Sequence, residues 1–589
     1  MPFRDVTDPA SAFASAPVHP TDDADSAVRR VAKVALAATL LLGLTVLLQI
    51  RVGAFDAGLG NDESSHYVSG LLIHDYLRHV LGASGGWISP MTFLRDFHSH
   101  YPLVGIGHWG PLYYVVEGVW MLVCGTGRWS VLLLSAMVTT ATALIVGSVA
   151  VRRAGLLLGA AAAIGLVASR VIQDGSSSVM LDNPIALLCL LAMLAYARFA
   201  AQAGRAGAAW WAALFGMLAG AGALIKGNAF ALALLPPLFV LFSGRFDLLR
   251  RWSFWLPLPI VAVIALPWTI WSYPLVAQGF RYSWGRAYSR VAMEACIAYL
   301  EAALGPVVFA VSAVGLGMVV LSRGKRAGSH GSAGQDAVLV AASALLAAVF
   351  LFQVIVPAAL QVRYLAPAIP SMMILAAEAL HRGRMAVMTR LGNRGRPATA
   401  ILFAVVALSA IPSVFAETQK HRFGVVKAAS AIWHGRIAAN PSVLIAANSE
   451  GEPAAVAELA MDDPQRPSLF VVRGSRLLAG GGYNNSDYVP RFATPAEAMA
   501  AVDSYAIPLV LLQLNPGNTS WRHIAQLADA RRAAPERWQL VWQNEKLALF
   551  RIRGNDTRVA DTARLAALSA PRSLGHRDRA SSPSGTAAQ

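Results

Sequence analysis

The stretch that decides the fold is RRVAKVALAATLLLGLTVLLQIRVGAFDAGLGNDESSHY, residues 29–67. Residues 34–50 carry no charge over a length that can cross a bilayer, and three basic residues stand just before them. The positive-inside rule therefore predicts a cytoplasmic N-terminus and places residues 51–109 outside. Two adjacent carboxylates, Asp62 and Glu63, then follow a membrane helix on its outer side.

The composition of the whole chain agrees with a protein that crosses the membrane many times. Of its 589 residues 56% are hydrophobic and only 14% are charged, which is too apolar for an ordinary soluble protein. The formal net charge is +16, but the basic residues lie in short clusters between apolar segments and form no single basic face. This pattern indicates membrane topology and predicts no nucleic-acid partner.

The cysteines and the N-terminal segment exclude two other classes of protein. Cys124, Cys189 and Cys296 are far apart, so the sequence predicts neither a disulfide framework nor a thiolate metal site. Residues 1–28 are polar and are expected to form a disordered cytoplasmic tail, with no cleavable signal peptide. The first apolar run should act as an uncleaved anchor.

Further apolar runs predict about eleven spans, within a polytopic α-helical fold of about 11 to 13 transmembrane helices. After residues 34–50, the predicted spans are residues 129–151, 154–172, 183–199, 207–225, 228–243, 253–274, 301–322, 336–358, 363–381 and 398–416. This order places the basic clusters of the later loops on the cytoplasmic side, as the positive-inside rule requires. These clusters are Arg152/Arg153, Arg198/Arg205, Arg245/Arg250/Arg251, Arg323/Lys325/Arg326 and Arg382/Arg384/Arg390/Arg394/Arg396.

One apolar run, GPLYYVVEGVWMLVCG at residues 110–125, does not fit as a full span. Counting this run as a span would place every later loop on the opposite side of the membrane from the one that the positive-inside rule requires. The run is also short, and it carries Glu117. We interpret it as an interfacial or re-entrant helix within a first external loop of residues 51–128. The alternative is that it spans the membrane and a later short run does not.

A different pattern begins after residue 416. Strand-like runs alternate with helix-like stretches such as residues 494–503, which predicts a small soluble α/β domain over residues 417–555 on the outer face. The remaining residues, 556–589, have the composition of a disordered tail. The strand-like runs are residues 442–448, 468–474, 507–514 and 547–554.

Most of the unusual polar residues fall on the predicted outer face, and one common site there is the simplest interpretation. Each group also has a structural alternative. Asp182 and the acidic pair could belong to helix N-termini, Lys226 could snorkel from a helix end, and the arginines of residues 281–290 could lie on an interfacial helix. The histidines could form a metal site together with a carboxylate. The outer-face residues are Asp62, Glu63, His66, Tyr67, His98, His100, His108, Asp174, Asp182, Lys226, Arg281, Arg286, Arg290 and Arg363.

Motifs along residues 30–416 resemble the GT-C-type glycosyltransferases that use polyprenyl-phosphate sugars, in the branch with protein O-mannosyltransferases and lipid A aminoarabinose transferases. One motif departs from the family: Trp109 and Gly110 replace the first proline of its usual HPPLYY-like stretch. The motifs that carry the resemblance are NDESSHY (61–67), HWGPLYYVVEGVW (108–120), GRWSVLLL (127–134), MLDNPIALLCLLAML (180–194), GALIKG (222–227) and QVRYLAPAIPSMMIL (361–375).

The resemblance implies a GT-C-like catalytic domain over residues 29–416 that moves a sugar from a polyprenyl-phosphate donor to an acceptor hydroxyl. Asp62 is our candidate for the general base that deprotonates the acceptor, with Glu63 and Asp182 as further catalytic candidates. Cations would stabilise the leaving phosphate, and displacement would be in-line and inverting. The candidate substrate-binding residues are Tyr67, His108, Tyr113, Lys226, Arg281, Arg286, Arg290, Arg363 and Tyr364.

The same resemblance places the protein in the cytoplasmic membrane, with its site and its C-terminal domain outside. The expected partners are the donor lipid and a glycan, lipid or protein acceptor. No cofactor is assigned, a divalent cation stays open, and the sequence selects neither the sugar nor the acceptor.

Other functions are compatible with many membrane spans. A transporter or lipid flippase would place its ions near the bilayer midplane, often in repeated halves, and this sequence has no internal repeat. A non-catalytic assembly factor would not need its outer acids and cations to converge. Ligation of a whole oligosaccharide is a further variant within the resembled family.

Overall fold

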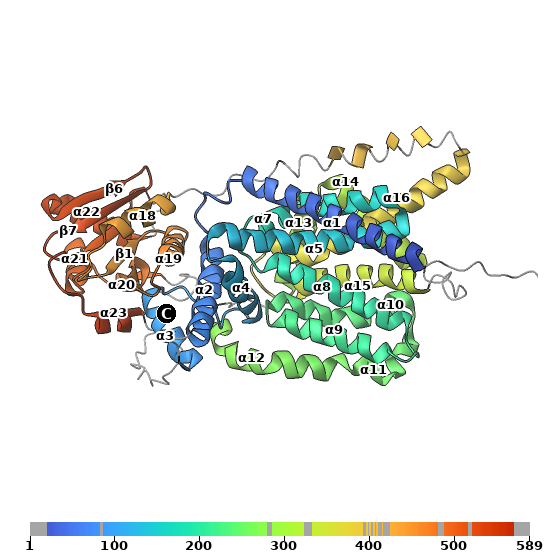
Figure 1. Cartoon of the computed structure of the whole chain (residues 1–589), viewed down its shortest axis with the longest axis horizontal. Coiled ribbons are helices and arrows are strands. Elements are labelled where there is room, and N and C mark those ends of the chain that lie inside the picture. The colour runs from blue at the N-terminus through green and yellow to red at the C-terminus, as the bar shows by residue number, and fades with distance from the viewer. Residues whose placement is uncertain are drawn as a thin grey trace, which may run out of the picture.

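The structure is a computed structural model with two parts, a long bundle of helices and, at one end of it, a smaller α/β domain (Figure 1). The helices α2 (Asn61–Leu81), α3 (Pro90–His100) and α4 (Leu112–Cys124) lie between the two parts. The described residues are 20–82, 86–279, 285–322, 333–392, 424–480, 488–515 and 521–569, with isolated residues between 396 and 415.

Apolar helices build the bundle, as the uncharged runs predict. Among the described residues, five helices are long and apolar enough to cross a membrane, or seven if each of two bent pairs is one span. The predicted number of 11 to 13 also counts shorter or charged helices, and residues 398–416, of which only isolated residues are described. The bundle helices include α1 (Pro20–Arg51), α5 (Arg128–Ala154), α8 (Asp182–Ala201), α9 (Ala208–Ala223), α10 (Leu235–Ser243), α12 (Pro257–Gly279), α15 (Ala333–Ile355) and α16 (Ile369–Leu391).

The sharper of the two bends has a local cause. Helices α13 (Arg286–Leu304) and α14 (Pro306–Leu321) meet at 115°, where Gly305 has φ +77°. Glycine adopts this left-handed conformation easily, and a proline at the first position then starts a new helix. Helices α6 (Leu156–Ala168) and α7 (Arg170–Ser176) meet at 62°.

The apolar run at residues 110–125 forms α4, which is only 13 residues long and packs along α2. Glycines allow this close approach: a Cβ on Gly118 would lie 2.8 Å from the Ile73 side chain, and one on Gly70 would lie within 3 Å of Glu117. The helix is therefore fixed to the external loop, and its interpretation as an interfacial helix stays a prediction.

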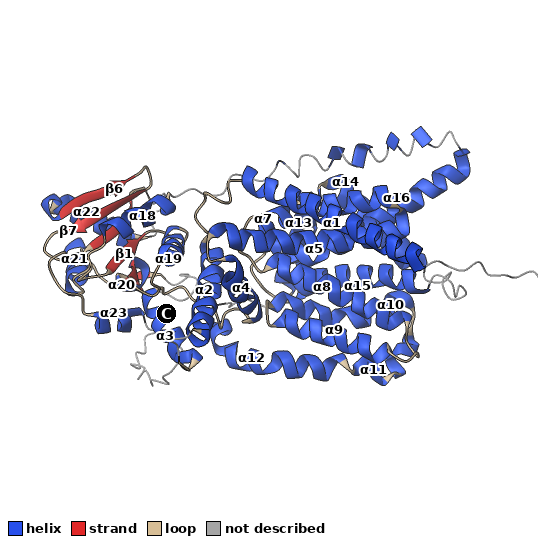
Figure 2. Ribbon diagram, viewed as in Figure 1, coloured by secondary structure: helices blue, strands red, loops and turns tan. Residues whose placement is uncertain are grey.

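The α/β domain contains a five-stranded sheet in the order β2-β1-β5-β7-β6 (Figure 2). The first three strands are parallel, with Val443 opposite both Val471 and Leu509, whereas β7 is antiparallel to β5 and β6. Helices cover the sheet, so β1 and β5 are buried along their whole length. The strands are β1 (Ser442–Ala446), β2 (Phe470–Arg473), β5 (Leu509–Gln513), β6 (Trp538–Gln543) and β7 (Leu547–Ile552).

Each of the four predicted strand runs contains a strand, and the predicted helix at residues 494–503 is α21 (Pro495–Ser504). A capping box between Thr494 and Glu497 starts that helix. The edge strand β6 was not predicted, because its sequence WQLVWQ is mostly exposed and lacks a buried apolar face. The other helices of the domain are α18 (Val425–Gly435), α19 (Gly451–Asp462), α22 (Arg522–Ala533) and α23 (Thr562–Ser569).

Two helices extend into segments that the sequence assigns to disordered tails. Helix α1 begins at Pro20, within the predicted tail 1–28, and α23 lies within the predicted tail 556–589. Leu565 of α23 is buried in the core of the α/β domain. Packing against the domain therefore orders this part of the chain, although its composition is typical of a tail.

The external loop and the α/β domain share one hydrophobic core. Tyr67 and Leu71 of α2 and Phe97 of α3 are buried in the same cluster as Val425 and Val456 of the domain. Since apolar burial is the main stabilising term between packed elements, the two segments hold each other in place.

Polar contacts fix the same boundary. Arg128, at the start of α5, pairs with Glu458 of α19, and Arg466 Nε donates to Asp75 Oδ2 of α2 at 3.0 Å. Burial raises the pKa of Glu458 to about 7, even though Arg128 acts to lower it. The Tyr101 hydroxyl donates to Asp463 Oδ2 at 2.5 Å.

Candidate active site

The first predicted acid, Asp62, pairs with a distant arginine. It lies in the first turn of α2, and Arg363 Nη2 donates to Asp62 Oδ2 at 2.6 Å. Arg363 comes from the 3₁₀-helix η4 (Val362–Ala368). The cap position of α2 is Gly60, so neither acid is the N-cap, but both lie in the first turn of the helix, as the helix N-terminus alternative expects.

A second ion pair joins Asp182 and Lys226. Asp182 is the first residue of α8, Lys226 follows α9, and Lys226 Nζ donates to Asp182 Oδ1 at 2.6 Å. Both side chains are buried, at 2% and 9% exposure. The lysine therefore does not snorkel, and the cap of α8 is Leu181 and not Asp182.

Tyr364 links the two pairs into one group. Its ring centroid lies 4.8 Å from Lys226 Nζ and 5.6 Å from Arg363 Cζ, so both cations face the same aromatic ring. We call Asp62, Asp182, Lys226, Arg363 and Tyr364 the charge cluster. Two carboxylates balance two cations in it, and each pair joins segments far apart in the sequence.

Burial and the charges of the cluster together set the protonation of two residues on α2, Asp62 of the cluster and the nearby His66. Burial alone would raise the pKa of Asp62, but Arg363, which also donates to it, and Lys226 lower it below its usual value. Burial, together with Lys226 and Arg363, lowers the pKa of His66 to about 3. Asp62 is thus a carboxylate and His66 a neutral imidazole, whose Nδ1 lies 2.8 Å from the Tyr114 hydroxyl.

The departure from the family motif at Gly110 has a steric reason. Leu112 N donates to Leu224 O at 3.1 Å, which brings the loop before α4 against the turn that carries Lys226. A Cβ on Gly110 would lie 2.0 Å from that same carbonyl oxygen. Only glycine fits there, so this stretch supports the backbone next to Lys226.

Two tyrosines of α13 support the loop that leads to Arg363. The Tyr288 hydroxyl accepts a hydrogen bond from Ala358 N at 3.1 Å and donates to Gln353 O at 3.1 Å. The Tyr299 hydroxyl donates to Leu360 O at 3.2 Å. Neither tyrosine is among the predicted site residues, because no sequence pattern in α13 indicates a contact with this loop.

Other predicted site residues lie outside the charge cluster. Glu63 is next to Asp62, and its carboxyl group packs near Gly60. Tyr67 is buried and its hydroxyl donates to Thr126 O at 2.8 Å, which is a structural contact. Tyr113 is buried in the bundle core, and His108 is half-buried with its pKa lowered by burial, and further by Arg476, to about 4.

Arg286 and Arg290 lie on α13, as the helix alternative for these arginines expects, and they do not join the charge cluster. Arg290 is 81% exposed and pairs with Glu294 at 3.3 Å, and Arg286 is exposed at the start of α13. In the described part of the chain, no hydrogen bond or ion pair joins either residue to the cluster. Arg281 lies outside the described residues.

The histidine alternative finds no metal-binding geometry within the described residues, where no group of three or more His, Cys, Asp or Glu could hold an ion. His100 stacks on Phe470 at 4.0 Å, and burial, with Arg473 and Arg476, lowers the pKa of His98 to about 4. Asp62 and Asp182 are each bonded to a cation, an arrangement that does not suit a divalent metal.

Comparison with solved structures identifies the architecture. The chain is similar to ArnT of Cupriavidus metallidurans bound to undecaprenyl phosphate, with TM-score 0.52 and 14% identity over 88% of this chain and 98% of that one. The chain has the GT-C fold. The apo form of ArnT aligns with TM-score 0.54 and 15% identity, over 91% of this chain and 99% of that one.

A third GT-C structure also aligns. It is the archaeal oligosaccharyltransferase AglB from Archaeoglobus fulgidus, in complex with an inhibitory peptide and a dolichol-phosphate, with TM-score 0.53 and 12% identity over 85% of this chain and 72% of that one. No protein-family model and no curated protein matches the chain by sequence. The GT-C fold, the apolar helices and the C-terminal sheet confirm the predicted fold class, a polytopic α-helical membrane protein with a small C-terminal α/β domain.

Proposed function

We propose that this protein is a membrane glycosyltransferase that moves a sugar from a polyprenyl-phosphate donor to an acceptor hydroxyl. The observation that carries this proposal is the charge cluster, where Arg363 and Lys226 are held with Asp62 and Asp182 around one tyrosine ring. Lipid phosphates bound to ArnT and AglB support a lipid-phosphate donor in a protein of the same fold. The GT-C fold alone does not select a reaction, so the proposal rests on the cluster.

The cations suit the leaving group. The donor's phosphate gains negative charge as the sugar departs, and cations fixed beforehand stabilise that charge more in the transition state than in the ground state. A bound phosphate would compete with Asp62 for Arg363, since both are anions within reach of one guanidinium. Donor binding would then free Asp62 from its ion pair and make it a stronger base.

The proposed transfer is a single displacement at the anomeric carbon of the donor sugar. The acceptor oxygen forms a bond to the anomeric carbon while the bond from that carbon to the phosphate oxygen breaks, and the phosphate keeps the electron pair. Asp62 takes the acceptor proton. With base and phosphate on opposite sides of the anomeric carbon, the configuration inverts and no sugar–protein intermediate forms.

The location follows from charge. We propose the cytoplasmic membrane, with the basic clusters inside and the charge cluster and the α/β domain outside. The donor sugar, hexosyl or pentosyl, and the acceptor, whether protein, lipid or glycan, are left open.

The test is turnover by purified protein with undecaprenyl-phosphate sugars and candidate acceptors. Asp62→Asn should lower turnover on the order of 10²- to 10⁴-fold while donor binding persists, because it removes the base and retains the shape. Lys226→Ala and Arg363→Ala should weaken donor binding and turnover together.

Arg290→Ala is the matched control, an exposed arginine of the same outer region that pairs only within its own helix. If Arg290→Ala and Lys226→Ala behave alike, the phosphate site lies elsewhere. Near-normal turnover by Asp62→Asn would exclude Asp62 as the base.

A further inference from the structure

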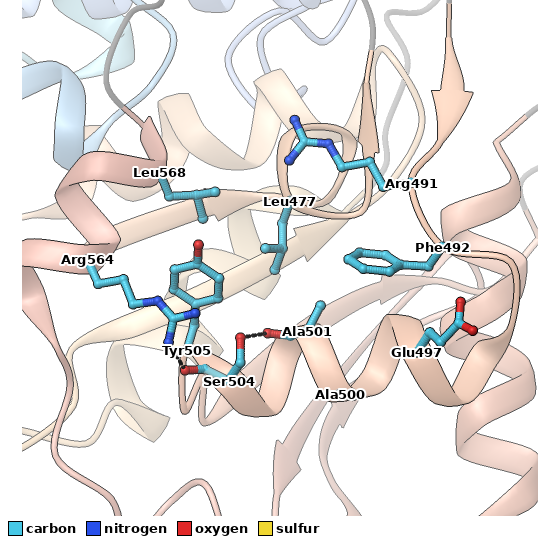
Figure 3. A pocket seen from close by; sticks show the side chains of 10 residues that line it. All are labelled: Leu477, Arg491, Phe492, Glu497, Ala500, Ala501, Ser504, Tyr505, Arg564 and Leu568. Atoms are coloured by element: carbon cyan, nitrogen blue, oxygen red, sulfur yellow. Dashed lines mark hydrogen bonds between the residues drawn. The ribbon is translucent and has the colours of Figure 1, made fainter.

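A hollow lies in the α/β domain, away from the charge cluster. It has a volume of about 460 Å³ and is bounded by α21, α23 and the short helix α20 (Gly474–Leu477) (Figure 3). That volume is in the range of pockets that hold small ligands. Segments distant in the sequence meet there, and none of them belongs to the charge cluster.

The walls of the hollow are apolar and aromatic. Ala500 and Ala501 of α21 leave room because their side chains are small, while Phe492 and Tyr505 contribute rings (Figure 3). Leu568 of α23 lies across from α21. Such a surface fits the face of a sugar ring, whose C–H groups pack against aromatic rings.

The charge of the hollow is positive. The Arg564 guanidinium stacks over the Tyr505 ring at 4.4 Å, and its Nη1 donates to Ser504 O at 2.8 Å, so it is held in one place. Arg491 lines the same hollow. Guanidinium groups are well suited to bind carboxylate and phosphate oxygens.

The acid that lines the hollow is engaged elsewhere. Glu497 Oε2 accepts from Ala493 N at 2.9 Å and Thr494 N at 3.4 Å, as part of the capping box of α21. Its charge is thus directed to its own helix N-terminus, and Figure 3 shows it at the other end of the hollow from Arg564.

We propose that this hollow binds an anionic sugar unit, with its ring on Phe492 and Tyr505 and its carboxylate or phosphate on Arg491 and Arg564. As a docking site for the acceptor, it rests on the proposed function and narrows the acceptor to an acidic glycan. Binding itself can be measured without turnover.

The chain's own C-terminal segment is a poorer occupant. Residues 570–589 follow α23 directly, but they contain Arg572, Arg577 and Arg579 against one aspartate, Asp578. A positive segment does not complement a positive hollow. An external anion fits the charge better.

The experiment is calorimetric titration of the full-length protein with four probes, namely a hexuronate disaccharide, a hexose phosphate, a neutral disaccharide and an acidic peptide. We expect at least one anionic sugar to bind at least tenfold more tightly than the neutral one. Comparing the two anionic sugars distinguishes a carboxylate from a phosphate ligand. Equal binding of neutral and anionic probes, or equal binding of an acidic peptide, would overturn the proposal.

Variants locate the binding. Arg564→Ala removes the fixed cation, and Ala500→Trp fills the hollow from an exposed position without changing charge; both should weaken anion binding at least tenfold. The matched control is Arg436→Ala, an exposed arginine stacked on Trp433 at 5.0 Å elsewhere in the domain. Unfolding temperatures confirm that each variant is folded. Unchanged binding in Ala500→Trp would contradict this location.

The same variants separate this inference from the proposed function. Asp62→Asn should lose turnover and keep binding of the anionic sugar, whereas Ala500→Trp should lose that binding and keep turnover on a short neutral acceptor. Loss of turnover on every acceptor in Ala500→Trp would show that the hollow is no separate site.

Discussion

At the scale of single residues, the absence of a side chain at one position matters as much as the charges of the cluster. Gly110 lies against Leu224 O, two residues before Lys226, and a Cβ there would lie 2.0 Å from that oxygen. The backbone on one side must then shift. A glycine can thus determine where Lys226, the proposed phosphate-binding cation, lies without touching the substrate.

We predict that Gly110→Ala lowers turnover by about 10²-fold, the loss typical of a misplacement of about 1 Å near the reacting groups. Donor binding should weaken as well, because Lys226 moves. The measurements are turnover, donor-lipid binding and unfolding temperature. Gly127→Ala is the control, since nothing lies within 4 Å of its added Cβ. Equal behaviour of the two variants would refute the steric argument.

The residue scale also shows what a sequence can and cannot reveal. Asp62, Asp182, Lys226 and Arg363 were singled out as charges on the predicted outer face, where an ion requires a partner, and the family resemblance added Tyr364. Their pairing was not predictable, since Arg363 meets Asp62 across 301 residues. The arginines of α13 carried the same signal of exposed outer charge, yet they remain on a solvated face.

At the scale of elements, α13 holds in place the loop that leads to η4 and Arg363. Its two tyrosine hydroxyls bind backbone groups of residues 353–360, immediately before Arg363. The break at Gly305 allows α13 to leave the direction of α14 by 115° and reach that loop. The predicted span at residues 301–322 begins within α13 and continues through α14, because hydropathy does not report where a helix bends.

We predict that Tyr288→Phe destabilises the Arg363 loop by about 1 kcal/mol, the usual net value of a lost hydrogen bond. Donor KM should rise severalfold, with a smaller change in kcat, because the residue positions Arg363 and touches no substrate. Tyr273→Phe on α12 is the control, an exposed tyrosine at 68% exposure. A fall in kcat with unchanged KM would contradict a positioning role.

At the scale of the whole molecule, the α/β domain and the external loop behave as one unit. Their boundary contains Glu458, whose pKa is raised to about 7 mainly by burial. A carboxyl with a raised folded-state pKa binds its proton more tightly in the folded protein. The stability that this group contributes is therefore present at low pH. It is lost as the pH rises from 4.5, the ordinary pKa of a glutamate, to about 7.

The prediction is that the wild type loses stability relative to Glu458→Gln across that window, and that the difference becomes constant above it. Thermal unfolding at a series of pH values measures this. Glu497→Gln is the control, an exposed acid of the same domain that caps α21 and lies outside the boundary. A difference between wild type and Glu458→Gln that does not vary with pH would contradict it.

The overall organisation was accessible from the sequence, because apolar runs and alternating strands are local patterns. The contact between its two halves was not, since Tyr67 and Val425 are separated by most of the membrane bundle in the chain. No local pattern in α2 indicates that its buried face is completed by α19. Such a shared core arises only from the three-dimensional arrangement.

That shared core also constrains the order of biosynthesis. In the proposed topology the external loop is among the first segments exported, whereas the residues that cover its apolar face are translated only near the end of the chain. During synthesis of about 300 intervening residues, α2 and α3 expose side chains such as Leu71 and Phe97, which are buried in the finished protein. The loop thus depends on the end of its own chain, and a ribosome that stops near residue 416 would release a product prone to aggregate and be degraded.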